Sequence, residues 1–155
     1  MTVTTQTMTD EQRKSVAIEY LKRLDRGEGF FDLFADDAQV YFPKWGLANG
    51  RAEFEQLFAD LGSLLSEIKH DHAYFNYIIQ GDTVVVEGTS SGKTAEGVEW
   101  RAGATHAGRW CDVFEIRNFL IQRCFIYLDP DYAGADTARY PWLKETAPVA
   151  KSGGR

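Results

Sequence analysis

The sequence predicts an α+β domain in which a curved sheet, antiparallel or mixed, wraps around three N-terminal helices. Apolar residues recur with the 3.6-residue period of a helix before residue 68 and with the two-residue period of a strand after it. A block of helices followed by a run of strands indicates α+β rather than alternating α/β order. A sheet curved around helices leaves a concave pocket between the layers, and such pockets are common ligand sites.

Start and stop signals place the individual elements. Thr9 and Gln12 have the spacing of a capping box, so the first helix is expected to begin at Thr9, and Gly27 is typical of a helix end. The expected helices are 9–27, 30–34 and 51–68, with a strand at 38–42 that Pro43 breaks. Later strands are expected at about 70–80, 83–90, 98–116 and 119–128, with turns at Gly81-Asp82, Ser91-Gly92 and Arg117-Asn118.

Length and composition predict one soluble domain. The chain has 155 residues, 44% of them hydrophobic and 26% charged, which suits one core and excludes disordered and collagen-like classes. We expect the domain at 9–130, frayed ends at 1–8 and 151–155, and an extension at 131–150. The extension carries Tyr132, Tyr140, Trp142 and Leu143, and is expected to cover the pocket mouth or to pack on a partner subunit.

Charge and cysteine content limit the partners and the compartment. A net charge of −6 opposes binding to nucleic acid and to anionic membranes. The N-terminus lacks the pattern of a signal peptide, and no apolar run has the length of a membrane helix. Cys111 and Cys124 are too few for a disulfide framework. These features predict a cytoplasmic protein.

No motif for a metal or cofactor is strong. A P-loop, a dinucleotide fingerprint, paired CxxC motifs and HExxH are all missing from the sequence. His70-Asp71-His72 places two imidazoles on one face of a strand, but a stable metal site needs three or four ligands. We therefore expect neither a metal nor a cofactor.

Two segments offer residues for acid–base chemistry, each with a structural alternative. Asp112 alternates with Trp110 and Phe114, so it is either a neutral acid in an apolar site or paired with Arg109 or a backbone amide at the margin of the strand. His72 shares a face with Asn76, and that face suits either a wet surface or a ligand pocket.

Two residues of the first helix also need partners. Tyr20 lies in the apolar stripe and needs a partner for its hydroxyl. Asp25 lies in the last turn, where the helix dipole disfavours an anion. It is expected to have a local turn role or a partner such as a histidine.

The order of elements, with the stretch LDRGEGFFDLFADDAQVYF, resembles the nuclear transport factor-like superfamily over about residues 9–130. That superfamily includes SnoaL-like polyketide cyclases, scytalone dehydratase, ketosteroid isomerase and limonene epoxide hydrolase. The resemblance implies a cone-shaped, cystatin-like α+β barrel and a homodimer formed through the outer sheet face. It indicates fold more strongly than chemistry.

The dehydratase branch matches best at individual positions. Asp25 in YLKRLDRGE and His72 in HDHAYFN resemble its catalytic pair, Asn76 follows as in related members, and His106 resembles its second pocket histidine. Tyr20 and Asp112 resemble the oxyanion hole of ketosteroid isomerase.

Two other branches match less well. The place of the ketosteroid isomerase base falls near Phe42, which cannot take a proton. The positions of the epoxide hydrolase residues hold Gly88, Ser90 and Ile126, so that chemistry is not expected.

The resulting hypothesis is a cofactor-independent lyase or cyclase acting on a hydrophobic, oxygenated, cyclic substrate. His72, oriented by Asp25, removes a proton beside a carbonyl, and Tyr20 and Asp112 stabilise the enolate oxygen, with Tyr41 or His106 as further candidates. The alternatives are a non-catalytic ligand-binding or dimerising domain and an isomerase like ketosteroid isomerase. The expected pocket wall comprises Phe42, Trp45, Trp100, Trp110, Phe114 and Tyr127.

Overall fold

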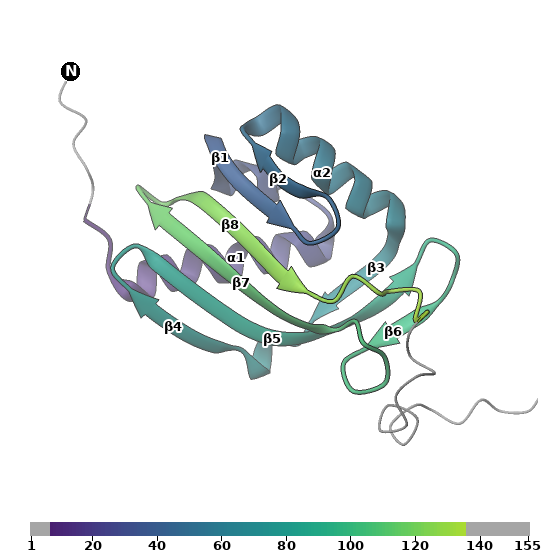
Figure 1. The fold of residues 1–155 in the computed structure, drawn as a ribbon. Helices are drawn as coiled ribbons and strands as arrows, with labels where there is room; N and C mark the ends of the chain where they lie inside the picture. Colours follow the sequence, from purple (N-terminus) through teal and green to yellow (C-terminus); the bar gives the residue numbers. More distant parts are fainter. Residues whose placement is uncertain (1–6, 136–155) are drawn as a thin grey trace, which may run out of the picture.

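The structure, a computed structural model, describes residues 7–135. Within them lie two α-helices, α1 (Asp10–Arg26) and α2 (Arg51–Leu64), and two short 3-10 helices, η1 (Phe30–Leu33) and η2 (His72–Tyr74). The strands are β1 (Phe34–Phe42), β2 (Gly46–Asn49), β3 (Leu65–His70), β4 (Asn76–Gln80), β5 (Thr83–Thr94), β6 (Glu99–Arg101), β7 (Arg109–Arg117) and β8 (Leu120–Leu128). The sheet curves around α1, and α2 lies beside β1 and β2 (Figure 1).

The strands form one open, mixed sheet. Its order is β2-β1-β8-β7-β5-β3, and β4 and β6 each pair with β5 as well. The β1–β8 pair is parallel, and the other pairs are antiparallel. The predicted α+β class with a curved sheet is confirmed.

The predicted first helix is confirmed at both ends. The Thr9 side chain accepts a hydrogen bond from the Gln12 backbone N–H at 3.1 Å, and the Gln12 side chain accepts one from the Thr9 N–H at 2.9 Å. Gly27 follows the helix with a φ of 72°, a left-handed conformation that glycine adopts without strain.

The prediction of three helices is not confirmed. The segment expected as a second helix is only the single 3-10 turn η1, and β1 begins at Phe34 rather than at residue 38. The helix expected at 51–68 ends at Leu64, because residues 65–70 pair with β5. A local periodicity cannot anticipate this pairing, since its partner lies far along the chain.

The strands after residue 70 are also divided differently. The strand expected at 70–80 is interrupted by η2, and the strand expected at 98–116 is divided into β6 and β7 by a loop at 102–108. The predicted turn at Gly81-Asp82 joins β4 to β5 as expected. The turn expected at Arg117-Asn118 lies one residue later, at Asn118 and Phe119, and both of these residues have a positive φ.

Ser91-Gly92 was expected to be a turn, but β5 continues through it to Thr94. A Cβ at Gly92 would lie 2.1 Å from the Glu67 carbonyl oxygen and 2.5 Å from the Trp100 ring. The glycine therefore permits the close packing of β3 and Trp100 on β5.

This close approach predicts that Gly92→Ala destabilises the protein. The added methyl group meets backbone that cannot rotate away, and overpacking of this kind costs about 1–3 kcal/mol. Urea unfolding measures the loss. Gly62→Ala is the matched control, because a Cβ there meets nothing within 4 Å, and equal stability losses in the two variants would contradict the packing role of Gly92.

The core lies between α1, α2 and the inner sheet face. Tyr20 is fully buried at its centre, with edge-on contacts to Phe34 at 5.5 Å and Phe114 at 5.6 Å between ring centroids. The prediction that residues 1–8 are frayed is wrong for Met8, which is buried and whose sulfur accepts a hydrogen bond from the Phe119 N–H. The predictions for Tyr140, Trp142, Leu143 and the tail concern residues outside the described range.

Candidate active site

Asp25, at the end of α1, is the centre of a cluster with two histidines. Its Oδ1 accepts a hydrogen bond from His70 Nδ1 at 2.5 Å, and its Oδ2 accepts bonds from the His70 backbone N–H at 3.0 Å and from His72 Nε2 at 2.9 Å. Burial raises the pKa of Asp25, but the hydrogen bonds and charge of His70, together with His72, outweigh this and lower the pKa overall. The ionised carboxylate only accepts, so both contacting ring nitrogens carry their hydrogens.

His70 is the histidine that faces the interior. It is the last residue of β3, only 7% exposed, and its ring lies edge-on to Trp110 at 5.0 Å. With Nδ1 bound to Asp25, a neutral His70 ring keeps a lone pair on Nε2. This Asp–His geometry orients an imidazole for proton transfer.

His72 meets the predicted contact with Asp25, yet it lies at the edge of the cluster. Its side chain is 31% exposed and does not line the inner cavity described below. The strand expected to carry His70 and His72 on one face ends at His70, so η2 turns the chain and brings His72 to the other oxygen of Asp25.

An inner cavity of about 30 Å³ lies between the sheet and the helices. That space is enough for roughly one water molecule. It contains four of the predicted site residues (Tyr20, Phe42, Trp110 and Asp112). The remaining lining residues are Leu24, Leu61, Ile68, His70, Ser90, Ile126, Leu128 and Tyr132.

Asp112 is a neutral acid in this cavity. It is 3% exposed on β7, and burial raises its pKa to about 8, so the carboxyl is protonated at pH 7. Arg109, the ion-pair partner in the alternative interpretation, is exposed, and no ion pair of Asp112 occurs within residues 7–135. The structure thus supports the neutral-acid interpretation.

Tyr20 supplies a second hydroxyl donor at the same cavity. The ring is fully buried, and its hydroxyl lies against the side chain of Cys124. Burial raises the pKa of Tyr20 well above its usual value, and the nearby Cys124 and Asp112 raise it further. Tyr20 therefore stays protonated and able to donate to an incoming oxygen.

Several predicted site residues lie away from the inner cavity. Tyr41 and Tyr127 contact each other at 5.6 Å on the outer sheet face, because Phe42 and Ile126, their neighbours along the strands, point inward. Asn76 is exposed at the start of β4, since the strand expected to align it with His72 is interrupted.

The remaining predicted residues do not line the inner cavity. Phe114 packs on Tyr20, Trp45 stacks on Phe42 at 5.0 Å, and Trp100 lies behind Tyr132 at 4.8 Å. His106 is half-buried in the loop at 102–108 and does not line the inner cavity. The homodimer expected at the outer face stays a prediction.

Sequence reasoning missed His70 and Ser90 as lining residues, whereas Tyr132 belongs to the extension that was expected to cover the pocket mouth. His70 was visible in the His-Asp-His motif and so carried a signal. Ser90 carried none, because its inward direction depends on the register of β5.

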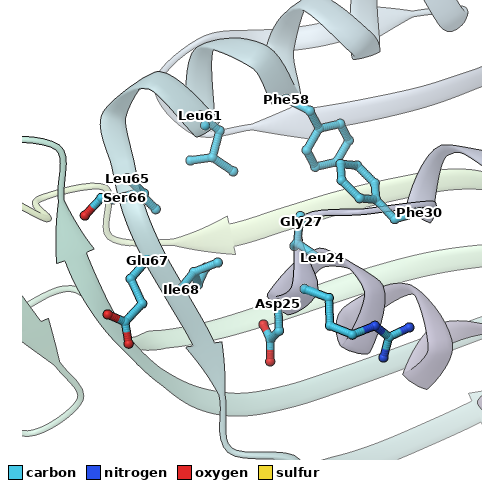
Figure 2. A pocket seen from close by; sticks show the side chains of 12 residues that line it. Leu24, Asp25, Gly27, Phe30, Phe58, Leu61, Leu65, Ser66, Glu67 and Ile68 are labelled. Atoms are coloured by element: carbon cyan, nitrogen blue, oxygen red, sulfur yellow. The ribbon is translucent and has the colours of Figure 1, made fainter.

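A larger pocket of about 390 Å³, separate from the inner cavity, is lined by Asp25 at the end of α1 (Figure 2). It opens between the ends of α1 and α2 and β3, with Asp25 and Glu67 on one side and Phe30 and Phe58 on the other. Leu24, Leu61 and Ile68 line both this pocket and the inner cavity, and so form the wall between them.

The described residues contain neither a group of metal ligands nor a membrane-spanning helix. No three histidine, cysteine or acidic side chains within residues 7–135 are grouped closely enough to hold a metal ion. None of the helices in the same range is long and apolar enough to cross a bilayer. Both cysteines are free, Cys124 buried and Cys111 half-buried.

Solved structures share this fold. A putative polyketide cyclase from Xanthomonas campestris pv. campestris superposes with a TM-score of 0.68 at 15% identity, over 82% of this chain and 97% of its own. An NTF2-like protein of unknown function from Burkholderia pseudomallei K96243 gives 0.65 at 16%, over 79% and 92%. A putative isomerase from Bacillus subtilis gives 0.65 at 19%, over 81% and 92%. At these identities the likeness shows the fold.

Sequence comparison adds the family. Comparison with curated proteins gives no match. The pattern of the SnoaL-like domain matches residues 18–124, which include α1 from its middle onward and most of the sheet. Since that match spans more than half of the sequence, the chain belongs to the SnoaL-like domain family.

Proposed function

We propose that this protein is a cofactor-independent acid–base enzyme that removes a proton beside a carbonyl group and eliminates water from a hydrophobic, cyclic substrate. The observation that carries the proposal is one cavity lined by a carboxylate-oriented imidazole, His70, and by two protonated oxygen acids, Tyr20 and Asp112. A base and two donors are the parts that enolisation needs.

The proposed steps use only these groups. His70 Nε2 takes the proton from the carbon beside the carbonyl, and the electron pair moves onto the carbonyl oxygen as an enolate. Tyr20 and Asp112 donate hydrogen bonds to that oxygen where its charge develops. The enolate then expels the β-hydroxyl group, which takes the proton back from His70 and leaves as water, so the product is an unsaturated carbonyl compound.

His72 acts in this scheme as a positioning residue. Its Nε2 donates a hydrogen bond to Oδ2 of Asp25, and His70 Nδ1 donates one to Oδ1. Both oxygens of the carboxylate are therefore fixed. The base is assigned to His70 rather than to the expected His72, because only His70 lines the cavity with the two acids.

The comparisons support this kind of chemistry. The family is SnoaL-like, and structures with the same fold include a putative polyketide cyclase and a putative isomerase. Transfer of the proton to another carbon, in place of loss of water, would make the same cavity an isomerase site.

A test of the proposal is hydrogen exchange in a panel of cyclic β-hydroxyketones. In D₂O the wild-type protein is expected to introduce deuterium beside the carbonyl and to release water, as measured by NMR and mass spectrometry. His72→Gln is expected to lower the rate of hydrogen exchange by no more than about tenfold, because the substitution removes a contact that orients Asp25 and leaves the base His70 in place.

The products distinguish the three functions. Loss of one water indicates the dehydratase reaction, and an unchanged mass with a moved double bond indicates an isomerase. Binding of the ketones without any exchange would favour the non-catalytic ligand-binding domain.

A further inference from the structure

Trp110 carries a buried indole N–H group that the fold does not use. The side chain belongs to β7, is 5% exposed and lines the inner cavity. Its Nε1 is closed off from solvent and has no hydrogen-bond partner within residues 7–135. Buried donors are nearly always paired, because an unpaired one has lost its contact with water and gained nothing in return. An unpaired donor in the lining of a cavity points to an acceptor that arrives with a ligand.

Packing fixes the place of this indole. Its ring lies edge-on to His70 at 5.0 Å and to Phe75 at 5.1 Å between ring centroids. Gly88 is the cross-strand partner of Trp110, and a Cβ at Gly88 would lie 2.7 Å from Cζ2 of the indole. Cζ2 and Nε1 are bonded to the same ring carbon, so the missing side chain at position 88 makes the room that this edge of the ring occupies. The indole is therefore held in the interior against His70.

This donor differs in kind from the two acids of the cavity. An indole N–H only donates and does not titrate, whereas Tyr20 and Asp112 are acids that the proposed reaction places at the enolate oxygen. His70, which the indole contacts, is the group that returns the proton to the departing hydroxyl group. The leaving oxygen must therefore lie close to His70 and, with it, close to Trp110.

A second tryptophan offers an internal comparison. Trp100, on β6, is 2% exposed, and its Nε1 also lacks a hydrogen-bond partner in the described part of the chain. It lies against Gly92, where a Cβ would be 2.5 Å from its Cζ2, but it does not line the inner cavity. The two indoles thus share burial and an unpaired N–H group, and they differ in whether they reach the cavity.

We propose that Trp110 Nε1 donates a hydrogen bond to the β-hydroxyl oxygen of the substrate and so selects β-hydroxyketones over ketones that lack this group. The carbonyl oxygen then lies toward Tyr20 and Asp112, and the hydroxyl oxygen lies toward Trp110 and His70. A ligand without the hydroxyl group leaves the buried indole unpaired, and a site built to pair with a hydroxyl group discriminates on this basis. The inference rests on the proposed function, which assigns the two oxygens.

The ring of such a ligand needs more space than the 30 Å³ of the inner cavity. The 390 Å³ pocket lies beyond Leu24, Leu61 and Ile68, three aliphatic side chains that also line the cavity (Figure 2). In the bound state these side chains turn to other staggered rotamers, so that the carbon ring extends into the larger pocket while its two oxygens reach the donors in the cavity.

The test compares two ligands that cannot lose water, 3-hydroxy-2,2-dimethylcyclohexanone and 2,2-dimethylcyclohexanone, on the full-length protein. They differ only in the β-hydroxyl group, and the carbon between the two functional groups carries no hydrogen that a base could remove. Trp110→Phe keeps an aromatic ring and removes the N–H group, and Trp100→Phe is the matched control. Titration calorimetry measures the affinities, and the ¹⁵N-labelled protein gives one indole N–H resonance for each of its four tryptophans.

Wild type and Trp100→Phe are expected to bind the hydroxyketone about tenfold more tightly than the ketone, the usual effect of one buried hydrogen bond. In Trp110→Phe this preference should fall to about twofold or less. The Trp110 N–H resonance of the wild type should move downfield with the hydroxyketone and much less with the ketone. Should Trp110→Phe fail to fold, the resonance is assigned through its nuclear Overhauser effect to His70 and carries the comparison in the wild type alone.

Four results would overturn the proposal: no preference for the hydroxyketone in the wild type, an undiminished preference in Trp110→Phe, an equal loss of preference in Trp100→Phe, or no binding of either ligand. Neither ligand can be dehydrated, so the two proposals fail separately. Equal dehydration of β-hydroxyketones by wild type and Trp110→Phe would remove the role of Trp110 and keep the enzyme. A preference that depends on Trp110, without any hydrogen exchange in the ketone panel, would remove the enzyme function and keep the indole donor.

Discussion

Replacing His70 with glutamine is expected to lower turnover of a cyclic β-hydroxyketone by about 10²–10⁴-fold, the usual contribution of a positioned general base. The glutamine amide can still donate a hydrogen bond toward Asp25, so the cluster keeps a polar contact while the cavity loses its proton acceptor. Single-turnover kinetics with the substrate found by the exchange assay would measure the loss.

His72→Gln is the matched control for this experiment. Both histidines contact Asp25, at 2.5 Å and 2.9 Å, but only His70 reaches the inner cavity. Equal losses in the two variants, or a greater loss at position 72, would contradict the assignment of His70 as the base. Thermal unfolding of both variants separates a catalytic loss from a structural one.

Asp112→Asn is expected to stabilise the protein increasingly as the pH rises from 4 to 8. Burial raises the pKa of Asp112 from 3.8 to about 8, so the folded state binds this proton more tightly than the unfolded chain does. The wild-type stability is therefore full below about pH 4 and falls as the pH rises toward 8, where the folded carboxyl ionises. Asparagine does not titrate and escapes this loss, which is on the order of 5 kcal/mol.

Urea unfolding at pH 4, 6 and 8 would measure this difference. Asp37→Asn, at an exposed position of β1, is the control for the removal of one negative charge. A stability gap between wild type and Asp112→Asn that does not widen with pH would contradict the neutral, buried carboxyl. The same ionisation predicts that activity falls above about pH 8, because an ionised Asp112 no longer donates to the enolate oxygen.

The elements that depend on local signals could be predicted from the sequence. The capping box at Thr9, the stop at Gly27 and the turn at Gly81-Asp82 all lie where they were expected, because each is set by residues within one turn of chain. The ends of α2 and β3 could not be predicted, since the pairing of residues 65–70 with β5 overrides the helical periodicity.

The candidate site shows the same division. The resemblance paired Asp25 with a histidine of HDHAYFN, and the carboxylate does contact His72. Tyr41 and Tyr127 lie away from the inner cavity, because strand alternation, once the register is known, turns both to the outer face. If the inward face of each strand had been known, Tyr41 and Tyr127 would not have been predicted as site residues, and Phe42 would have been.

By itself, the sequence determined the α+β class, the limits of α1 and the presence of an acidic side chain and an imidazole that belong together. Only the tertiary structure decided which histidine faces the cavity and that Asp112 is neutral. The physical reason is that direction, burial and pKa depend on neighbours brought in by strand register and by the packing of α1 on the sheet.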